Sequence, residues 1–221
     1  MAFGTIYSYS ANPRVCKIQA IAYLNGLNID EAADFVMGET NKTSAFLAKF
    51  PHGKVPAFEG EDGTTIFDSD AIARYVAESG PLAAQLVGRT PQERAVIQQW
   101  VNFAASDIIT HVTPLALWRF GVAEYDVKVE DTAFERLQRS LSTLERHLRG
   151  RKWIATEDRL SLADVTVASY LIWGFAVVID SDLRARYPSV VAWYERVNTV
   201  EAVRLAFGDL KFVQKRKEPA V

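Results

Sequence analysis

The segment from Phe50 to Ser69 constrains the fold of this chain most, because it places a proline inside an apolar run that otherwise has the pattern of a strand. A proline in a central strand would remove a hydrogen bond of the sheet, so Pro56 indicates an edge or backbone that is left free for a partner. A glycine-containing turn and a second strand follow, and Asp68 and Ser69 then predict the start of a helix. Free strand backbone beside a helix N-terminus is suited to binding a small peptide with a carboxylate.

Composition excludes several other classes of protein. The chain has 221 residues, 49% of them apolar, and a formal net charge of −2, which predicts a folded core and no nucleic-acid binding apart from a short basic tail that we interpret as solvated. A single cysteine, Cys16, excludes an internal disulfide framework and favours a reducing compartment. The three histidines show no ligand spacing, so no metal site is expected.

The sequence predicts neither a targeting signal nor a membrane-spanning segment. The N-terminus has no basic segment followed by an apolar one, so no secretory signal is expected. The apolar run from Val165 to Ile179 is shorter than the roughly 18 residues that a membrane span needs, and we interpret it as a buried helix. These features predict a soluble, cytoplasmic protein that does not bind a membrane.

The order of local signals predicts two domains. Strands are expected over 5–9, 28–35, 57–59 and 64–67, and helices over 13–24, 44–49 and 69–77. This α/β order, ending in a hairpin and a helix, predicts a thioredoxin-like N-terminal domain over residues 1–80. After a linker at 81–91, residues 92–221 carry helical periodicity only, which predicts an all-α C-terminal domain with a capping-box pattern at Ser161 to Asp164.

The helix start at Ser69 is the first candidate for chemistry. If Ser69 caps the helix, the unpaired N–H groups could bind a ligand carboxylate while Asp68 pairs with a ligand ammonium group. The alternative is that both residues only stabilise the helix end. The backbone at Val55 and Pro56 could pair with an extended peptide, and nearby lysines could bind a second carboxylate or be ordinary surface residues.

Several longer motifs resemble those of the cytosolic glutathione transferases, over nearly the whole chain. The stretch from Asn41 to Phe58 resembles the glutathione-binding segment of that family, Phe67-Asp-Ser-Asp-Ala-Ile72 resembles its acidic-Ser-x-Ala-Ile motif, and Ser161-Leu-Ala-Asp164 its C-terminal capping box. Three stretches, Gly4 to Tyr9, Phe50 to Gly60 and Gln99 to Ile108, are most similar to the subgroup that contains the N-terminal part of translation elongation factor 1B gamma.

The resemblance implies glutathione as co-substrate and assigns it a binding site. Val55 would contact its cysteinyl backbone and Pro56 would be cis, while Asp68 and Ser69 would bind the γ-glutamyl end. Lys42 would lie near the glycyl carboxylate. Lys54 would stand where the family often has glutamine. Two features depart from the family: Asn41 stands where some classes have histidine, and the N-terminal motif from Tyr7 to Arg14 matches neither the plain tyrosine type nor the plain serine-proline type.

Three residues are candidates for activating the glutathione thiol. A hydroxyl that donates to sulfur near a helix N-terminus lowers the pKa of a thiol. Ser10, just ahead of the helix start at Asn12, is the first candidate, followed by Asn12 and then Tyr7; Ser10 could instead be only a turn residue. Cys16, inside the first helix, is more consistent with a small core residue than with a nucleophile.

The resemblance leaves two functions to compare. One is a glutathione transferase, of the kind that serves detoxification, conjugating the thiolate to small hydrophobic electrophiles. The other is a non-catalytic interaction module like the elongation-factor domain. Aromatic and apolar residues of the helical domain are candidates for the electrophile pocket, although each could belong to the ordinary core. They are Phe103, Ile108, His111, Trp118 and Phe120. By resemblance, a homodimer is expected.

Overall fold

The N-terminal half of the chain is built on a mixed sheet. The structure is a computed structural model that describes residues 2–219, and within that range four strands lie in the order β2-β1-β3-β4. They are β1 (Gly4–Tyr7), β2 (Ile29–Glu31), β3 (Ala57–Gly60) and β4 (Thr65–Phe67). The β1–β2 pair is parallel, and the other two pairs are antiparallel. Together with α1 (Pro13–Leu24), α2 (Ser44–Lys49) and α3 (Ser69–Glu78), this confirms the thioredoxin-like fold.

Local signals position these elements well, with two corrections. Asn12 caps α1 through its side chain, which accepts from the backbone N–H of Arg14, and a proline follows at the first helical position, as expected. The strand expected over 28–35 is too long: β2 has three residues, because the chain turns away after Ala32 donates to the Ile6 carbonyl. The first strand ends at Tyr7 rather than at residue 9.

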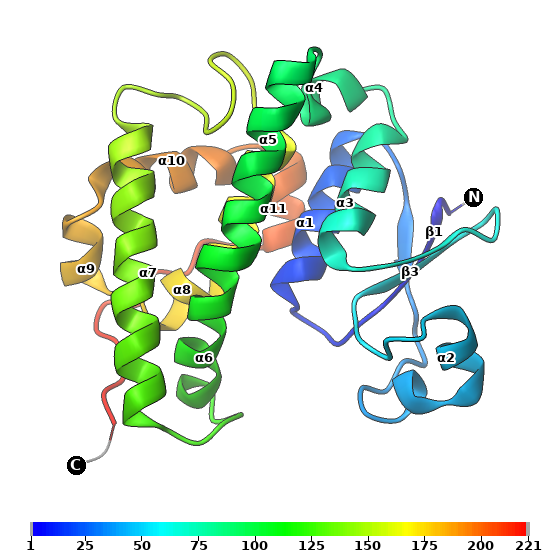
Figure 1. Ribbon diagram of the computed structural model, residues 1–221, viewed down its shortest axis with the longest axis horizontal. Helices are drawn as coiled ribbons and strands as arrows, with labels where there is room; N and C mark the ends of the chain where they lie inside the picture. The colour runs from blue at the N-terminus through cyan, green and yellow to red at the C-terminus, as the bar shows by residue number, and fades with distance from the viewer. Residues whose placement is uncertain (1, 220–221) are drawn as a thin grey trace.

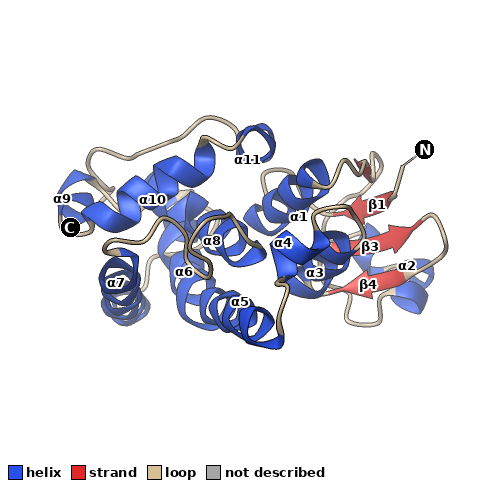
Figure 2. Cartoon of the chain, turned by 90° about the horizontal axis from the view of Figure 1, so that it is seen from above, coloured by secondary structure: helices blue, strands red, loops and turns tan. Residues whose placement is uncertain are grey.

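The two faces of the sheet pack against different helices. In Figures 1 and 2, α1 and α3 lie between the sheet and the helical half, and α2 lies on the far face. Ile6 and Phe58, both fully buried, belong to the main core, whereas Tyr7 joins a separate cluster with Phe46 and Phe50 of the α2 side. This alternation follows from the two-residue period of a strand.

The second half is helical. Its elements are α4 (Ala83–Val87), α5 (Pro91–Phe103), a π-helical turn η2 (Ala104–Ile108), α6 (Ile109–Arg119), α7 (Val127–Leu148), α8 (Leu162–Val177), α9 (Ser181–Ala185), α10 (Pro188–Asn198) and α11 (Glu201–Phe207). The segment 81–91, expected as a linker, thus contains the short helix α4. No helix within residues 2–219 combines the length and the apolar character needed to cross a membrane.

Helix α8 is the centre of the helical half, and the capping box predicted at its start is present. The Asp164 carboxylate accepts from the backbone N–H of Ser161 at 3.0 Å, from that of Ile154 at 2.8 Å, and from the Trp193 indole at 3.0 Å. The Ser161 hydroxyl donates to the same carboxylate at 2.9 Å. Because Asp164 is completely buried, desolvation raises its pKa, although these four hydrogen bonds oppose the shift. The carboxylate therefore ties α8 to α10 and to the preceding loop.

Helix packing joins the two halves, and backbone hydrogen bonds fix the C-terminal segment to the helical half. Helix α1 packs against α8 and α11, and α3 packs against α8. After α11 the chain crosses back over the helical half (Figure 1), where the Val213 N–H donates to the Phe175 carbonyl at 2.9 Å and the Ser181 N–H to the Gln214 carbonyl at 3.2 Å. These bonds hold the C-terminal segment against α8 and α9.

Candidate functional site

The N-terminus of α3 differs from the sequence-based expectation in its cap. Asp68, not Ser69, is the N-cap residue: its φ is 77°, in the left-handed region, and its carboxylate accepts from the backbone N–H groups of Asp70 at 2.9 Å and Ala71 at 3.1 Å. Ser69 is the first helical residue, and its side chain is buried toward α1 and α8. A local pattern cannot distinguish two adjacent polar residues as caps, because either can accept from the first turn.

A cavity of about 390 Å³ lies at this helix end. Five of the seven residues predicted to bind glutathione line it: Lys54, Val55, Pro56, Asp68 and Ser69. The Val55–Pro56 peptide bond is cis, as the family resemblance implies. The cavity therefore brings the β3 entry loop and the α3 N-terminus together, although they are separated by a hairpin in the sequence.

Asn41 and Lys42 lie outside the lining of this cavity. Asn41 is buried, with its amide donating to the Gly53 carbonyl at 2.7 Å and accepting from the Gly38 N–H at 2.7 Å. It thus holds the loop that precedes Val55. Lys42 is exposed on the short 3-10 turn η1 (Thr40–Lys42).

Three lining residues of the same cavity were missed by the sequence reasoning: Arg14, His52 and Phe67. Arg14 lies in the first turn of α1, with its guanidinium 5.8 Å from the centre of the Tyr170 ring. Its position just after the Asn12 cap was the one signal that could have suggested it. With Lys54 opposite and Asp68 at the helix end, the cavity presents both signs of charge, which suits a ligand with carboxylates and an ammonium group.

The three candidates for thiol activation occupy different environments. Ser10 is exposed in the loop between β1 and α1, next to Ala11 with φ of 57°. The Asn12 amide is buried and donates to the Ser8 hydroxyl at 3.0 Å. The Tyr7 hydroxyl faces the α2 side and donates to Glu59 at 2.9 Å, and burial and this acidic partner raise the pKa of Tyr7.

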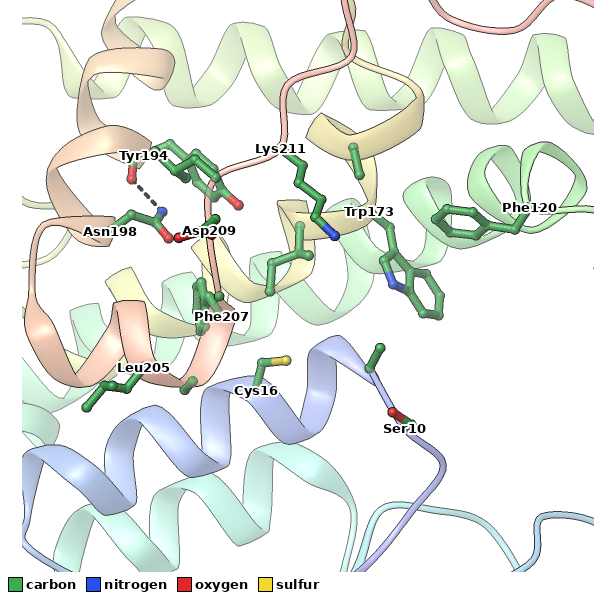
Figure 3. Close-up of a pocket in the computed structure, with 16 residues that line it drawn as sticks. Ser10, Cys16, Phe120, Trp173, Tyr194, Asn198, Leu205, Phe207, Asp209 and Lys211 are labelled. Atoms are coloured by element: carbon green, nitrogen blue, oxygen red, sulfur yellow. Dashed lines mark hydrogen bonds between the residues drawn. The ribbon is translucent and has the colours of Figure 1, made fainter.

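A second, larger cavity of about 600 Å³ lies beside α1 (Figure 3). Its walls come from the β1–α1 loop, α1, the end of α6, α8, α10, α11 and the C-terminal segment. Four of its lining side chains are aromatic: Phe120, Trp173, Tyr194 and Phe207. Ser10 and Cys16 line it from below in Figure 3. Since Ser10 lines this cavity and Arg14 lines the smaller one, the α1 N-terminus borders both.

Phe120 alone of the five predicted electrophile-pocket residues lines this larger cavity. Ile108 is fully buried, and Phe103 packs edge-on against Trp100, 5.2 Å between ring centres. The Trp118 indole donates to Glu130 at 2.7 Å, and His111 lines a separate hollow on α6 and α7. Helical periodicity identifies buried faces, but it does not tell which buried residues border a cavity.

Cys16 reaches the larger cavity without the character of a nucleophile. Burial raises the pKa of its thiol to about 11, so very little of it is thiolate near neutral pH. Cys16 is thus partly exposed to the cavity rather than a core residue as expected, but the raised pKa of its thiol argues against a role as a nucleophile.

Comparison with known proteins identifies the family. Residues 2–78 match the family described as Glutathione S-transferase, N-terminal domain, and residues 103–201 match Glutathione S-transferase, C-terminal domain. The chain is 47% identical over 215 residues to the Glutathione S-transferase-like protein LUC7 of Fusarium sp, covering 97% of both chains. It is 36% identical to Elongation factor 1-gamma of Danio rerio, covering 97% of this chain but 48% of that protein.

Solved structures agree with the fold. The theta class glutathione S-transferase of Xanthomonas axonopodis pv. citri, solved with glutathione bound, superposes with a TM-score of 0.82 over 95% of this chain and 99% of that one, at 23% identity. That likeness concerns the fold alone. From the two matched domains and the relative that is similar along its whole length, the chain belongs to the glutathione S-transferase family.

Proposed function

We propose that this protein is a glutathione transferase that binds glutathione in the 390 Å³ cavity and conjugates its sulfur to a small hydrophobic electrophile held in the 600 Å³ cavity. The observation that carries this proposal is the shared border at the α1 N-terminus. A ligand anchored at Ser69 and Val55 would extend toward Ser10, where the second cavity opens. Two adjoining sites, one polar and one aromatic, suit a reaction between a charged peptide and an apolar partner.

The charges of the smaller cavity support glutathione as its ligand. Glutathione carries two carboxylates and one ammonium group, and the cavity offers Arg14 and Lys54 as cations and Asp68 as an anion. The family relatives support the same ligand, since one of the superposed enzymes was solved with glutathione bound. Lys42 and Asn41 would act from outside the cavity, Asn41 by holding the loop before Val55.

Ser10 is the proposed donor to the thiolate. Its hydroxyl is exposed at the border of the two cavities, whereas Asn12 is engaged as a cap and Tyr7 is bonded to Glu59. A donated hydrogen bond stabilises the thiolate, and the thiol proton leaves to solvent. With a chloro-dinitro-aromatic acceptor, the sulfur–carbon bond forms and chloride departs with the bonding pair.

A titration and an assay test this proposal together. Glutathione is titrated while tryptophan fluorescence is followed, and turnover of the chloro-aromatic acceptor is then measured with wild type and Ser10→Ala. We expect binding below the millimolar range, and a thiol pKa about one unit higher in Ser10→Ala, which lowers kcat roughly tenfold below that pKa. Absence of glutathione binding at millimolar concentration would reject the enzyme. Binding with unchanged turnover in Ser10→Ala would shift the role to Asn12.

The alternative function is a non-catalytic interaction module. It is favoured by the 36% identity to an elongation factor 1-gamma along 97% of this chain. In that case the wild type would bind a protein partner through the same fold and give no turnover above the uncatalysed rate with any acceptor tested. The assay above therefore separates the two functions.

We also propose a two-fold homodimer in a cytoplasmic compartment, both by analogy with the family. Light scattering coupled to size-exclusion chromatography tests the first part, with a mass near twice 24.7 kDa expected. A mass of one chain at micromolar concentration would contradict it.

A further inference from the structure

Lys17 is the most unusual side chain beside the smaller cavity. It lies on α1 with no exposed surface, although lysine is among the residues least often fully buried. Its ammonium donates to the Ser69 hydroxyl at 3.1 Å and to the Tyr170 hydroxyl at 2.6 Å, and it forms an ion pair with Asp70. It also lies 4.4 Å from the centre of the Tyr170 ring. The group therefore sits where α1, α3 and α8 meet, directly behind Ser69.

The donors and acceptors of this cluster can be assigned one by one. An ammonium has three N–H donors and no acceptor, so the three contacts of Lys17 occupy it fully. The Tyr170 hydroxyl accepts from Lys17 and donates its own proton to the Asp70 carboxylate, at 3.1 and 3.3 Å to the two oxygens. The Ser69 oxygen accepts from Lys17. The Ser69 hydroxyl proton has no carboxylate partner in the cluster, and the Tyr170 oxygen, 3.2 Å away, is the neighbour there that can accept it.

We infer that Lys17 is a positioning residue for the glutathione site: by donating to both the Ser69 and the Tyr170 oxygens, it competes with the Ser69–Tyr170 hydrogen bond and makes the Ser69 hydroxyl proton available to the α-carboxylate of the γ-glutamyl group. This inference rests on the proposed function. The nearby positive charge also polarises the Ser69 O–H bond, which strengthens its donated hydrogen bond. Without Lys17, the Ser69 proton would stay on the Tyr170 oxygen, which would have lost its other donor.

The energetic cost of burying Lys17 supports a functional role. Desolvation lowers the pKa of Lys17 to about 8, even though Asp70 and, more weakly, Asp68 act in the opposite direction, and Arg14 adds to the lowering. A buried ion pair is often no more stable than an apolar replacement of similar size. Stability alone therefore gives little reason for a lysine at this position, whereas direction of the Ser69 proton does.

A binding experiment with two ligands isolates this role. Affinities are measured by calorimetry at pH 7 for reduced glutathione and for an analogue whose γ-glutamyl α-carboxylate is an amide. The proteins are wild type, Lys17→Met, Tyr170→Phe, which keeps the Lys17–Ser69 bond, and the control Lys128→Met on the exposed surface of α7. For Lys17→Met we expect glutathione affinity to fall roughly 5–10-fold and analogue affinity to change less than about twofold. For Tyr170→Phe and Lys128→Met, both should stay within about twofold.

The outcomes separate the inference from the proposed function. If wild type binds glutathione and Lys17→Met binds it equally well, or if both ligands lose affinity equally, Lys17 has no role specific to the carboxylate and the inference is wrong. If wild type itself binds no glutathione, the proposed function fails first. Should Lys17→Met fold poorly, the double variant Lys17→Met/Asp70→Asn removes both charges of the pair, and the same loss of preference for glutathione is expected.

Discussion

The Tyr7 hydroxyl donates a hydrogen bond of 2.9 Å to the Glu59 carboxylate, on the face of the sheet that packs against α2. Glu59 also pairs with Lys49, 2.6 Å between Nζ and Oε1. This network lies across the sheet from α1, and Tyr7 lines neither the 390 Å³ nor the 600 Å³ cavity. The Tyr7 hydroxyl therefore does not share a cavity with Ser10. The two candidate hydroxyls, of Tyr7 and Ser10, therefore lie in different parts of the structure.

Tyr7→Phe is therefore expected to leave the pKa of bound glutathione within about 0.3 units of wild type, because the lost hydrogen bond joins Glu59 and not the thiol. The pKa is read from thiolate absorbance in the ultraviolet as pH is varied, with Ser10→Ala as the comparison. A rise of a full unit in Tyr7→Phe would contradict the assignment of Ser10.

Arg14→Ala is expected to weaken glutathione binding roughly tenfold, because a charge-assisted hydrogen bond to a carboxylate is worth about 1.5–3 kcal/mol. Arg14 lines the smaller cavity and is half-buried, so a bound carboxylate would be shielded from water there. The change is measured as KM for glutathione at saturating acceptor. Arg149→Ala, on an exposed surface at the end of α7, is the matched control and should leave KM unchanged.

Cys16 is expected to react slowly with iodoacetamide at pH 7.5. Its thiol pKa of about 11 leaves roughly two orders of magnitude less thiolate than a free cysteine, whose pKa is near 8.5. The rate is followed by mass spectrometry, with glutathione alone as reference. Alkylation as fast as that of free cysteine would show that Cys16 is an activated nucleophile, and it would reopen thiol-exchange chemistry.

Asp164→Ala is expected to destabilise the fold by about 3–5 kcal/mol, because it leaves buried donors of Ser161, Ile154 and Trp193 without an acceptor. Chemical denaturation gives the free energy of unfolding. The exposed Asp158→Ala serves as control and should change it by less than about 0.5 kcal/mol. A loss below about 1 kcal/mol in Asp164→Ala would mean that water replaces the carboxylate.

The pH dependence of stability should carry a signature of Lys17. Its pKa is about 8 in the folded state and about 10.4 in the unfolded chain, so between these values the unfolded state binds more protons. The free energy of unfolding therefore gains a contribution from Lys17 that rises from pH 8 to pH 10.4, by a few kcal/mol in total. It is measured as the difference between wild type and Lys17→Met over that range. A difference that stays constant or falls would mean that Asp70 outweighs desolvation.

Much of the architecture could be predicted because its signals are local. Asn12 caps α1 with a proline after it, and Ser161 and Asp164 form the capping box of α8, both as the sequence indicates. The apolar run from Val165 to Ile179 lies largely within the buried helix α8, also as expected. Errors arose where neighbouring residues compete for one role. Asp68 rather than Ser69 caps α3, because the Ser69 side chain bonds to Lys17 and Tyr170 on other helices. Strand β2 ends at Glu31, where the chain turns away after pairing with β1.

The sequence by itself determined the order of elements, the thioredoxin-like and helical halves, and the Val55–Pro56 and α3 segments of the smaller cavity, because each depends on residues close together in the chain. Only the tertiary structure decided that Phe120 borders the larger cavity while Ile108 is core, and that Arg14 lines the smaller one. It alone brought Lys17 to Tyr170, 153 residues away. Contacts over such separations follow from how α1, α3 and α8 pack together, and that packing is set by the whole core rather than by any local pattern.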